Sequence, residues 1–305
     1  MVDGKVCNAV CDNKSTLKCY ICGATSKDFN DINNITRIRI DESNIKLNFG
    51  LSILHAWIRF FECLLHLAYK LNVKKWRVLD SKSKEVIKTN KIRIQQEFKS
   101  QLGLIVDKPK PGFGSSNDGN TARSFFENSF ISSSITRIDE GIIKQFQVVL
   151  LVISSGYNIN VDKFKIFTLD TAKNFVNKYP WYPMSTAVHK ILIHSSEVIS
   201  SCILPIGQLS EEAQEARNKN FRKYREDFSR KMSRKVTMED VFNRLLVSSD
   251  PYISSMRNLP KKELKTYSKE VLDLLQPPDY NLDTEKNIND SSSDSEYNSS
   301  TDSSD

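Results

Sequence analysis

The sequence predicts a mainly α-helical protein with little β-strand. Apolar residues recur at helical spacing along much of the chain, helix-start signals precede some of these segments, and prolines or glycines separate them. Hydrophobic residues make up 39% of the 305 residues, which is enough for a substantial core. A chain of this length forms one large domain or two of ordinary size.

The expected helices follow one another along the chain. They cover residues 51–71, 88–103, 121–130, 139–155, 161–178, 185–203, 210–235 and 237–257. The first is apolar almost all round, so we expect it to be buried, whereas the second is amphipathic. Residues 108–120 hold two prolines and three glycines, which predicts an ordered loop or a crossover. Ser210 and Thr237 are typical helix N-caps.

The expected helix 210–235 has two distinct faces. One apolar stripe about 140° wide is typical of a core-facing helix, and it holds Leu209, Ala213, Ala216, Phe221, Tyr224 and Phe228. From 217 to 235 the chain carries nine lysines or arginines and two acids. Glu215 lies opposite the stripe, near Lys219 and Arg222. A carboxylate in such a surface suits the handling of a metal-bound phosphodiester, but an exposed helix with a simple Glu215–Lys219 ion pair is the more ordinary explanation.

Charge is unevenly distributed along the chain. The net charge is +7, but residues 281–305 carry seven acids and one lysine, so this tail is −6 and the first 280 residues are +13. A body this basic favours a polyanion, nucleic acid before membrane, although many basic proteins bind neither. The Ser/Asp-rich tail is too polar to bury a core, so we expect it to be disordered.

A membrane location is not expected. The most apolar run, residues 51–71, is interrupted by His55, Arg59, Glu62 and His66. The first 20 residues are polar and do not resemble a signal peptide. We therefore expect an intracellular protein whose six cysteines are reduced, so that metal ligation or burial explains them better than disulfides.

Two short motifs carry metal-ligand spacing. Cys19 and Cys22 form a C-x2-C pair, and His189 and His194 form an H-x4-H pair. Two thiolates and two imidazoles are the ligands of a closed structural zinc site. Against this, 166 residues separate the pairs, and two histidines five apart point about 140° from each other on a straight helix. One alternative is an all-cysteine site in which Cys7-x3-Cys11 joins the first pair, and another is ordinary buried side chains.

Four blocks of sequence, in order, resemble the Transib family of DNA transposases and the related catalytic subunit of the vertebrate V(D)J recombinase. The most informative is IHSSEVISSCILPIGQLSEEAQEARNKNFRKYR at 193–225. The others are MVDGKVCNAV…CYICGATSKDFN, LHAWIRFFECLLHLAYKL and KPKPGFGSSNDGNTARSFF. The resemblance covers about residues 2–250. It implies an RNase H-like core with a DDE triad and a helical, zinc-bearing insertion before the glutamate.

The resemblance assigns roles to individual residues. It implies structural Zn²⁺ ligation by Cys19, Cys22, His189 and His194. The triad glutamate falls best on Glu215, with Glu212 as the alternative, and Asp3 matches the second aspartate. Nothing in the sequence corresponds to the first aspartate, so we expect most of the RNase H-like sheet and the terminal-repeat-binding domain to be absent. His55, in a matched block, is either a core histidine or a catalytic group.

The catalytic expectation follows from the chemistry of two-metal phosphoryl transfer. Such a site usually needs three carboxylates to hold two Mg²⁺ or Mn²⁺ ions. With two acids alone, Asp3 and Glu215, we predict little or no nuclease activity unless the triad is completed. DNA binding depends less on the triad, and the residues expected to contact phosphates are Arg217, Lys219, Arg222, Lys223, Arg225 and Arg123.

The expected architecture is a zinc-stapled helical insertion domain plus the last helix of an RNase H-like DDE core. Residues 1–35 would hold the end of that core and the C-x2-C knuckle, and 36–206 the helical insertion domain with the H-x4-H pair. Residues 207–276 would form basic C-terminal core helices, and 277–305 the disordered tail.

The expected function is that of the C-terminal portion of a Transib-like DDE recombinase. Such a protein would be nuclear and would bind terminal-repeat-like DNA ends, with no membrane partner. The resemblance also implies a homodimer, because paired DNA ends need paired active sites. One alternative is a domesticated, non-catalytic zinc-binding module that binds DNA or protein. Another is a helical scaffold whose basic face is merely solvated.

Overall fold

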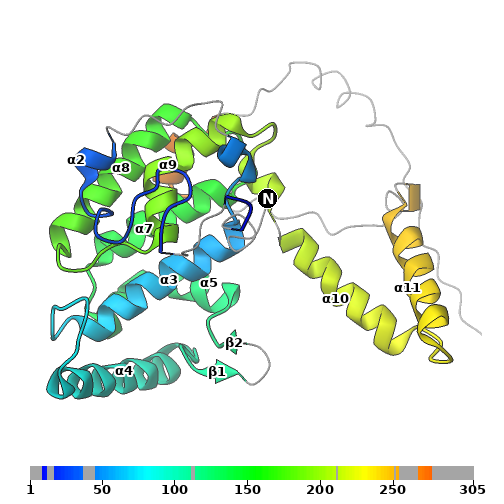
Figure 1. Cartoon of the computed structure of the whole chain (residues 1–305), viewed down its shortest axis with the longest axis horizontal. Helices are drawn as coiled ribbons and strands as arrows, with labels where there is room; N and C mark the ends of the chain where they lie inside the picture. Colours follow the sequence, from blue (N-terminus) through cyan, green and yellow to red (C-terminus); the bar gives the residue numbers. More distant parts are fainter. Residues whose placement is uncertain are drawn as a thin grey trace, which may run out of the picture.

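Helices form nearly all the regular structure in the computed structural model of the chain (Figure 1). The structure describes residues 9–11, 17–36, 45–110, 114–210, 212–250, 252–253 and 267–276. Within these ranges the strands are β1 (Pro109–Lys110) and β2 (Gly114–Ser115), a two-residue antiparallel pair that closes the Pro/Gly-rich loop. The prediction of a mainly helical protein is therefore confirmed.

The helical body contains most of the described chain. Its α-helices are α2 (Ile32–Ile35), α3 (Ile53–Lys70), α4 (Ser81–Leu102), α5 (Gly119–Glu127), α6 (Ser129–Thr136), α7 (Glu140–Ser154), α8 (Val161–Lys178), α9 (Thr186–Ser201) and α13 (Lys269–Leu274). Two 3-10 helices, η1 (Ile45–Phe49) and η2 (Ile206–Leu209), complete it. A second unit, α10 (Glu212–Asp227) with α11 (Arg234–Ser249), stands apart from this body in Figure 1.

Helix α3 lies at the centre of the body and packs on α4, α5, α7 and α9. Its buried residues occur on nearly every side of the helix, as expected for the most apolar segment. Phe60 meets Phe146 of α7 with ring centres 4.8 Å apart, and Phe61 meets Phe125 of α5 at 5.0 Å. These aromatic pairs add to the burial of apolar area that holds the body together.

Helices α8 and α9 pack closely along each other and carry the histidine pair into the body. Ion pairing between Lys165 of α8 and Glu197 of α9, at 2.8 Å, joins them at the surface. Helix α13 packs on α7 and α8, and Leu275, just after it, bridges to Ile159. The segment 267–276 is thus part of the body although it follows the α10–α11 unit in sequence.

Most of the body helices begin at a residue that the sequence marks as an N-cap. Each such side chain accepts a hydrogen bond from a backbone amide in the first turn, which contributes about 1 kcal/mol. These caps are Asp31, Asp80, Asp118, Asp139, Asn160, Ser185 and Ser268. Asp80 explains why α4 begins earlier than the predicted residue 88.

Three further predicted helices, 121–130, 210–235 and 237–257, have different boundaries in the structure. The segment 121–130 belongs to two helices, α5 and α6, with Asn128 between them. The segment 210–235 ends at Asp227, and the next helix begins at Arg234 rather than 237. Ser233, not Thr237, caps α11 by accepting from the amide of Val236. Helix α11 stops at Ser249, because a residue before a proline (here Pro251) is disfavoured in the helix.

The sequence predicts that the apolar stripe of the 210–235 segment faces the core, but the described part of the stripe does not face the core of the body. Leu209 lies in η2, outside the helix, and Phe221, Tyr224 and Phe228 are not among the buried core residues. Helix α10 packs on α11, and Phe228 is 44% exposed with the Arg244 guanidinium 5.0 Å from its ring centre. The stripe therefore joins two helices of a hairpin. The side chains of 212–216 lie outside the described residues.

No described helix is both long and apolar enough to cross a bilayer. The Ser/Asp-rich tail, residues 277–305, lies outside the described residues, as do residues 1–8.

Candidate metal centre

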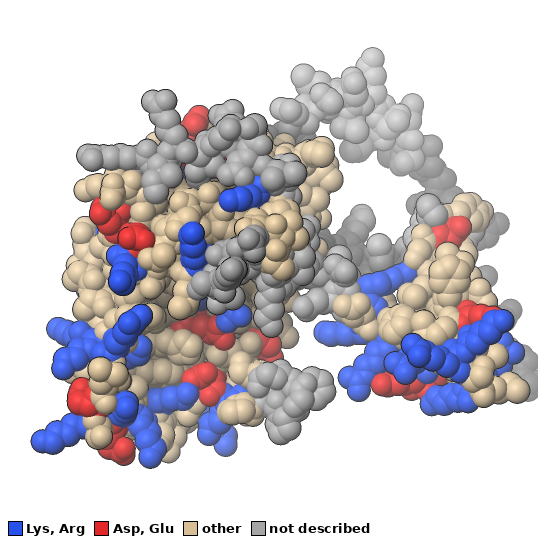
Figure 2. Space-filling model, in the orientation of Figure 1, with Lys and Arg blue, Asp and Glu red and all other residues tan. Residues whose placement is uncertain are grey.

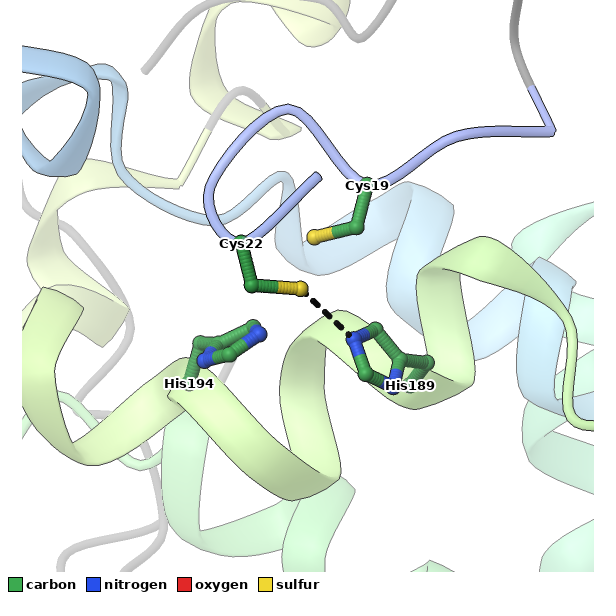
Figure 3. Close-up of side chains that lie close together, drawn as sticks. All are labelled: Cys19, Cys22, His189 and His194. Atoms are coloured by element: carbon green, nitrogen blue, oxygen red, sulfur yellow. Dashed lines mark hydrogen bonds between the residues drawn. The ribbon is translucent and has the colours of Figure 1, made fainter. Parts of the chain in front are cut away.

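The two cysteines lie on a tight loop formed by residues 17–25. The amide of Cys19 donates to the carbonyl of Ala24, and the amide of Gly23 donates to the carbonyl of Cys19, both at 2.8 Å. Gly23 has a φ of +77°, a left-handed conformation that glycine adopts readily. This turn directs both sulfur atoms toward the body (Figure 3).

The two histidines lie on α9, which begins at the Ser185 cap just before them. Both rings are buried, with exposed fractions of 0% for His189 and 2% for His194. Their ring centres are 5.1 Å apart, and the rings are nearly perpendicular. Phe29, from the segment after the cysteine loop, stacks on His189 at 4.3 Å. This stacking helps to fix the orientation of the His189 ring.

The cysteine loop and α9 bring four ligand atoms together (Figure 3). One atom from each of Cys19, Cys22, His189 and His194 lies within 4.8 Å of all the others. Cys22 Sγ and His189 Nε2 are 3.4 Å apart. Ligand atoms of a tetrahedral zinc ion lie about 3.3–3.8 Å apart, given Zn–N and Zn–S bonds of about 2.0 and 2.3 Å. A small closure of the loop would bring these atoms to that spacing.

An unsatisfied polar atom at the centre supports a metal ion there. His194 Nε2 is buried and has no hydrogen-bond partner, whereas His189 Nε2 lies 3.4 Å from Cys22 Sγ. Buried polar groups nearly always have partners, so each exception needs a reason. A metal ion would supply the partner for one nitrogen of each imidazole, and the two sulfurs complete a donor set that suits zinc.

The protonation of these groups also favours a cation. Burial lowers the pKa of His189, which keeps the imidazole neutral and able to donate a lone pair. The contact with Cys22 lowers the pKa of the Cys19 thiol, and the same contact raises the pKa of Cys22. A bound cation favours the thiolate form of both.

The structure separates the metal-site alternatives. The mixed set of two cysteines and two histidines is the one group of potential ligands found among the described residues. Cys11 is described but is not part of this group, and Cys7 lies outside the described residues. Two histidines five apart point about 140° from each other on a straight helix. His194 nevertheless lies mid-helix in α9, and one ring nitrogen of each histidine belongs to the group of atoms within 4.8 Å of one another.

The predicted catalytic carboxylates all lie outside the described side chains. Asp3 lies outside the described residues. Glu212 and Glu215 belong to the backbone of α10, but their side chains are not described. His55 lies in the first turn of α3, where its Nδ1 is 2.6 Å from Ser52 Oγ, an arrangement that a structural histidine explains.

The predicted DNA-binding residues comprise two half-buried arginines, Arg217 and Arg123, and four exposed residues on α10. Arg217 donates to the carbonyl of Leu245 and to Ser249 Oγ, so it joins α10 to α11. Arg123 lies in the body with its guanidinium 5.4 Å from the ring centre of Trp57. The remaining residues are exposed on α10, and they are Lys219, Arg222, Lys223 and Arg225. In Figure 2 this unit carries dense positive charge.

Sequence reasoning missed two residues that position the centre, Phe29 and Asn30. Phe29 is fully buried against His189, and the side chain of Asn30 bonds to the backbone of residues 180–184. Their only sequence signal is their place directly after the C-x2-C loop.

Comparisons with known proteins yield no match: no protein-family model and no curated protein sequence matches the chain.

Proposed function

We propose that the chain is the C-terminal portion of a Transib-like DDE recombinase that acts on DNA. One observation supports this most directly: the ligand set that the resemblance implies converges on a single site. The C-x2-C pair and the H-x4-H pair are far apart in sequence, yet their ligand atoms lie within 4.8 Å of one another. A chance similarity of short motifs does not require such convergence.

In this proposal the zinc ion is structural. Four protein ligands leave no open position for a substrate or a water, which is typical of zinc that stabilises a fold. The ion would join the loop 17–25 to α9 and close a long loop, which reduces the entropy of the unfolded chain. This structural role of zinc does not depend on an RNase H-like core. We propose separately that the chain contains the last helix of such a core.

DNA binding is assigned to α10. Lys219 and Arg225 are exposed and have no ion-pair partner within the described part of the chain, whereas Arg222 pairs with Glu226 at 2.9 Å. Lys223 lies 5.8 Å from the ring centre of Phe228 and remains exposed. Cations on one helix neutralise phosphates without reading bases, so the affinity falls steeply with rising salt.

Cleavage would depend on Glu215 and Asp3 together with a further carboxylate. Magnesium or manganese ions would be held by these acids and would activate the nucleophile and stabilise the leaving oxygen. We propose that the chain alone nicks DNA weakly or not at all. Metal-dependent nicking of terminal-repeat DNA that is abolished by Glu215→Ala would contradict this part of the proposal.

The DNA-binding assignment is tested by matched charge reversals. Arg225→Glu on α10 should weaken duplex binding several-fold and reduce the slope of log K against log salt by about 1. Lys163→Glu makes the same charge change at an exposed position of α8, in the helical body, and should have little effect on duplex binding. If both variants bind like the unmodified chain, α10 is not the DNA surface.

A second candidate is a non-catalytic zinc-stapled interaction module. It is favoured by the exposed apolar side chains of α11, where Phe242 is 59% and Leu246 54% exposed. Exposed apolar patches of this kind mark protein interfaces. Under this alternative Glu215→Ala changes neither DNA affinity nor DNA cleavage, whereas Phe242→Ser and Leu246→Ser abolish association with a protein partner.

A further inference from the structure

A pocket of about 360 Å³ opens on the body between the cysteine loop region, the α3–α4 connection and the segment before α9. Its lining includes the two partly exposed tryptophans of the chain, Trp76 and Trp181, and two prolines, Pro180 and Pro183. The rest of the lining consists of polar and basic side chains, namely Ser26, Lys27, Asn30 and Arg77. Neither the zinc centre nor the α10–α11 unit contributes a residue to it.

The walls of this pocket are held in place. Lys70 Nζ lies 4.4 Å from the ring centre of Trp76 and donates to the carbonyl of that residue. The rings of Trp76 and Trp181 both meet Tyr182 edge-on, at 4.9 and 5.5 Å. Asn30 donates to the carbonyls of Pro180 and Tyr182, which ties this segment to the metal-bearing region. The aromatic surfaces are thus present before any ligand arrives.

The charge at the rim identifies the kind of ligand. Lys27 and Arg77 are exposed, and neither has an ion-pair partner among the residues that the structure describes. The nearest acid in sequence, Asp28, accepts from the amide and hydroxyl of Thr25, both at 2.8 Å. Lys74 and Lys75 precede Trp76, and basic side chains gather at the lower left of the body in Figure 2.

We propose that this pocket binds an unpaired nucleobase of a nucleic acid, with Lys27 and Arg77 contacting the flanking phosphates. Aromatic rings together with cations are the combination that single-stranded nucleic acids require, because bases stack on the rings and the backbone needs positive charge. A proline-rich peptide could also pack on the tryptophans of this pocket, but such a peptide carries no anionic group that would pair with Lys27 and Arg77. The inference extends the proposed function, since it rests on nucleic acid being the partner.

The tryptophans themselves provide the test. The chain has three, so the indole N–H region of a ¹⁵N-correlated NMR spectrum contains three signals. Trp57 is buried, with its Nε1 donating to Ser154 Oγ at 3.0 Å, and serves as the internal reference. Titration of the full chain with a short oligodeoxyadenylate should shift the signals of Trp76 and Trp181 and leave Trp57 in place.

Substitutions then test which side chains contribute to oligonucleotide binding. Trp181→Ala should weaken oligonucleotide binding about tenfold, and Lys27→Glu with Arg77→Glu should weaken it while keeping the fold. Phe130→Ala, an aromatic side chain 73% exposed on α6, is the matched control and should have no effect. Preserved signals in the unbound spectrum show that each variant is folded.

Three results would overturn the inference. The first is unchanged signals of Trp76 and Trp181 at saturating oligonucleotide. The second is a shift caused by a proline-rich peptide but not by the oligonucleotide. The third is equal loss of binding in Phe130→Ala and Trp181→Ala.

If the chain still binds duplex DNA in any of these cases, the assignment of DNA binding to α10 stands and only the pocket is wrong. A chain that binds no DNA in any form contradicts both.

Discussion

His194 is the ligand whose removal has the clearest expected effect, because its buried Nε2 has no other partner. His194→Ala should abolish tight zinc binding and lower the free energy of unfolding by roughly 4 kcal/mol, as loss of a structural metal does. Metal content by mass spectrometry and unfolding by denaturant measure the two effects. His66→Ala, a half-exposed histidine on α3, is the control and should keep the metal. Equal zinc content in both variants would contradict the site.

Acidification should release the metal. Burial lowers the pKa of His189 below its ordinary value of 6.5, so the folded chain binds fewer protons there than the unfolded chain. The stability due to neutral His189 is therefore complete above pH 6.5 and is lost as pH falls through the folded-state pKa. Protonation of the ligands also competes with zinc. A chromophoric chelator should detect release as the pH falls from about 6.5 to 5. Retention of zinc at pH 4 would contradict this.

At the scale of residues, the sequence predicts the metal ligands but not the side chains that hold them in position. The spacings of Cys19-x2-Cys22 and His189-x4-His194 are visible in the chain because metal ligation fixes residue types. The ring of Phe29 on His189 and the side-chain bonds of Asn30 depend on which segments meet in three dimensions. A single phenylalanine or asparagine carries no such information.

At the scale of elements, local signals predict helices well where caps and stops are strong. The prediction for 161–178 agrees with α8 at both ends, because Asn160 caps its start and Tyr179-Pro180 ends it. Where two signals compete, prediction fails. Ser233 and Thr237 both have cap chemistry, and the tertiary pairing of α10 with α11 selects Ser233.

The contact between η2 and the end of α7 gives a prediction at this scale. A Cβ on Gly207 would lie 2.4 Å from the backbone nitrogen of Gly156, so Gly207→Ala forces the two segments apart. We expect a loss of about 2 kcal/mol in the free energy of unfolding, measured by denaturant titration. Gly103→Ala is the comparison: its φ of +66° disfavours alanine, but nothing lies within 4 Å, so a cost of about 1 kcal/mol is expected. Equal costs would show that the close contact is absent.

At the scale of the whole molecule, the body would be closed by two long-range connections. Zinc would join the cysteine loop to α9, and α13 returns after the α10–α11 unit to pack on α7 and α8. The first connection could be anticipated from ligand chemistry. The second could not, because a six-residue helix has too few apolar residues to specify a partner, although Val271 and Leu274 are buried.

X-ray absorption at the zinc edge of the purified full chain identifies the ligands of the ion. We expect one zinc per chain with two sulfur ligands at about 2.3 Å and two nitrogen ligands at about 2.0 Å. His189→Ala should remove this signal, whereas His66→Ala should preserve it. Four sulfur ligands would instead identify the all-cysteine set of Cys7, Cys11, Cys19 and Cys22, and a chain that folds without any metal would contradict the zinc centre itself.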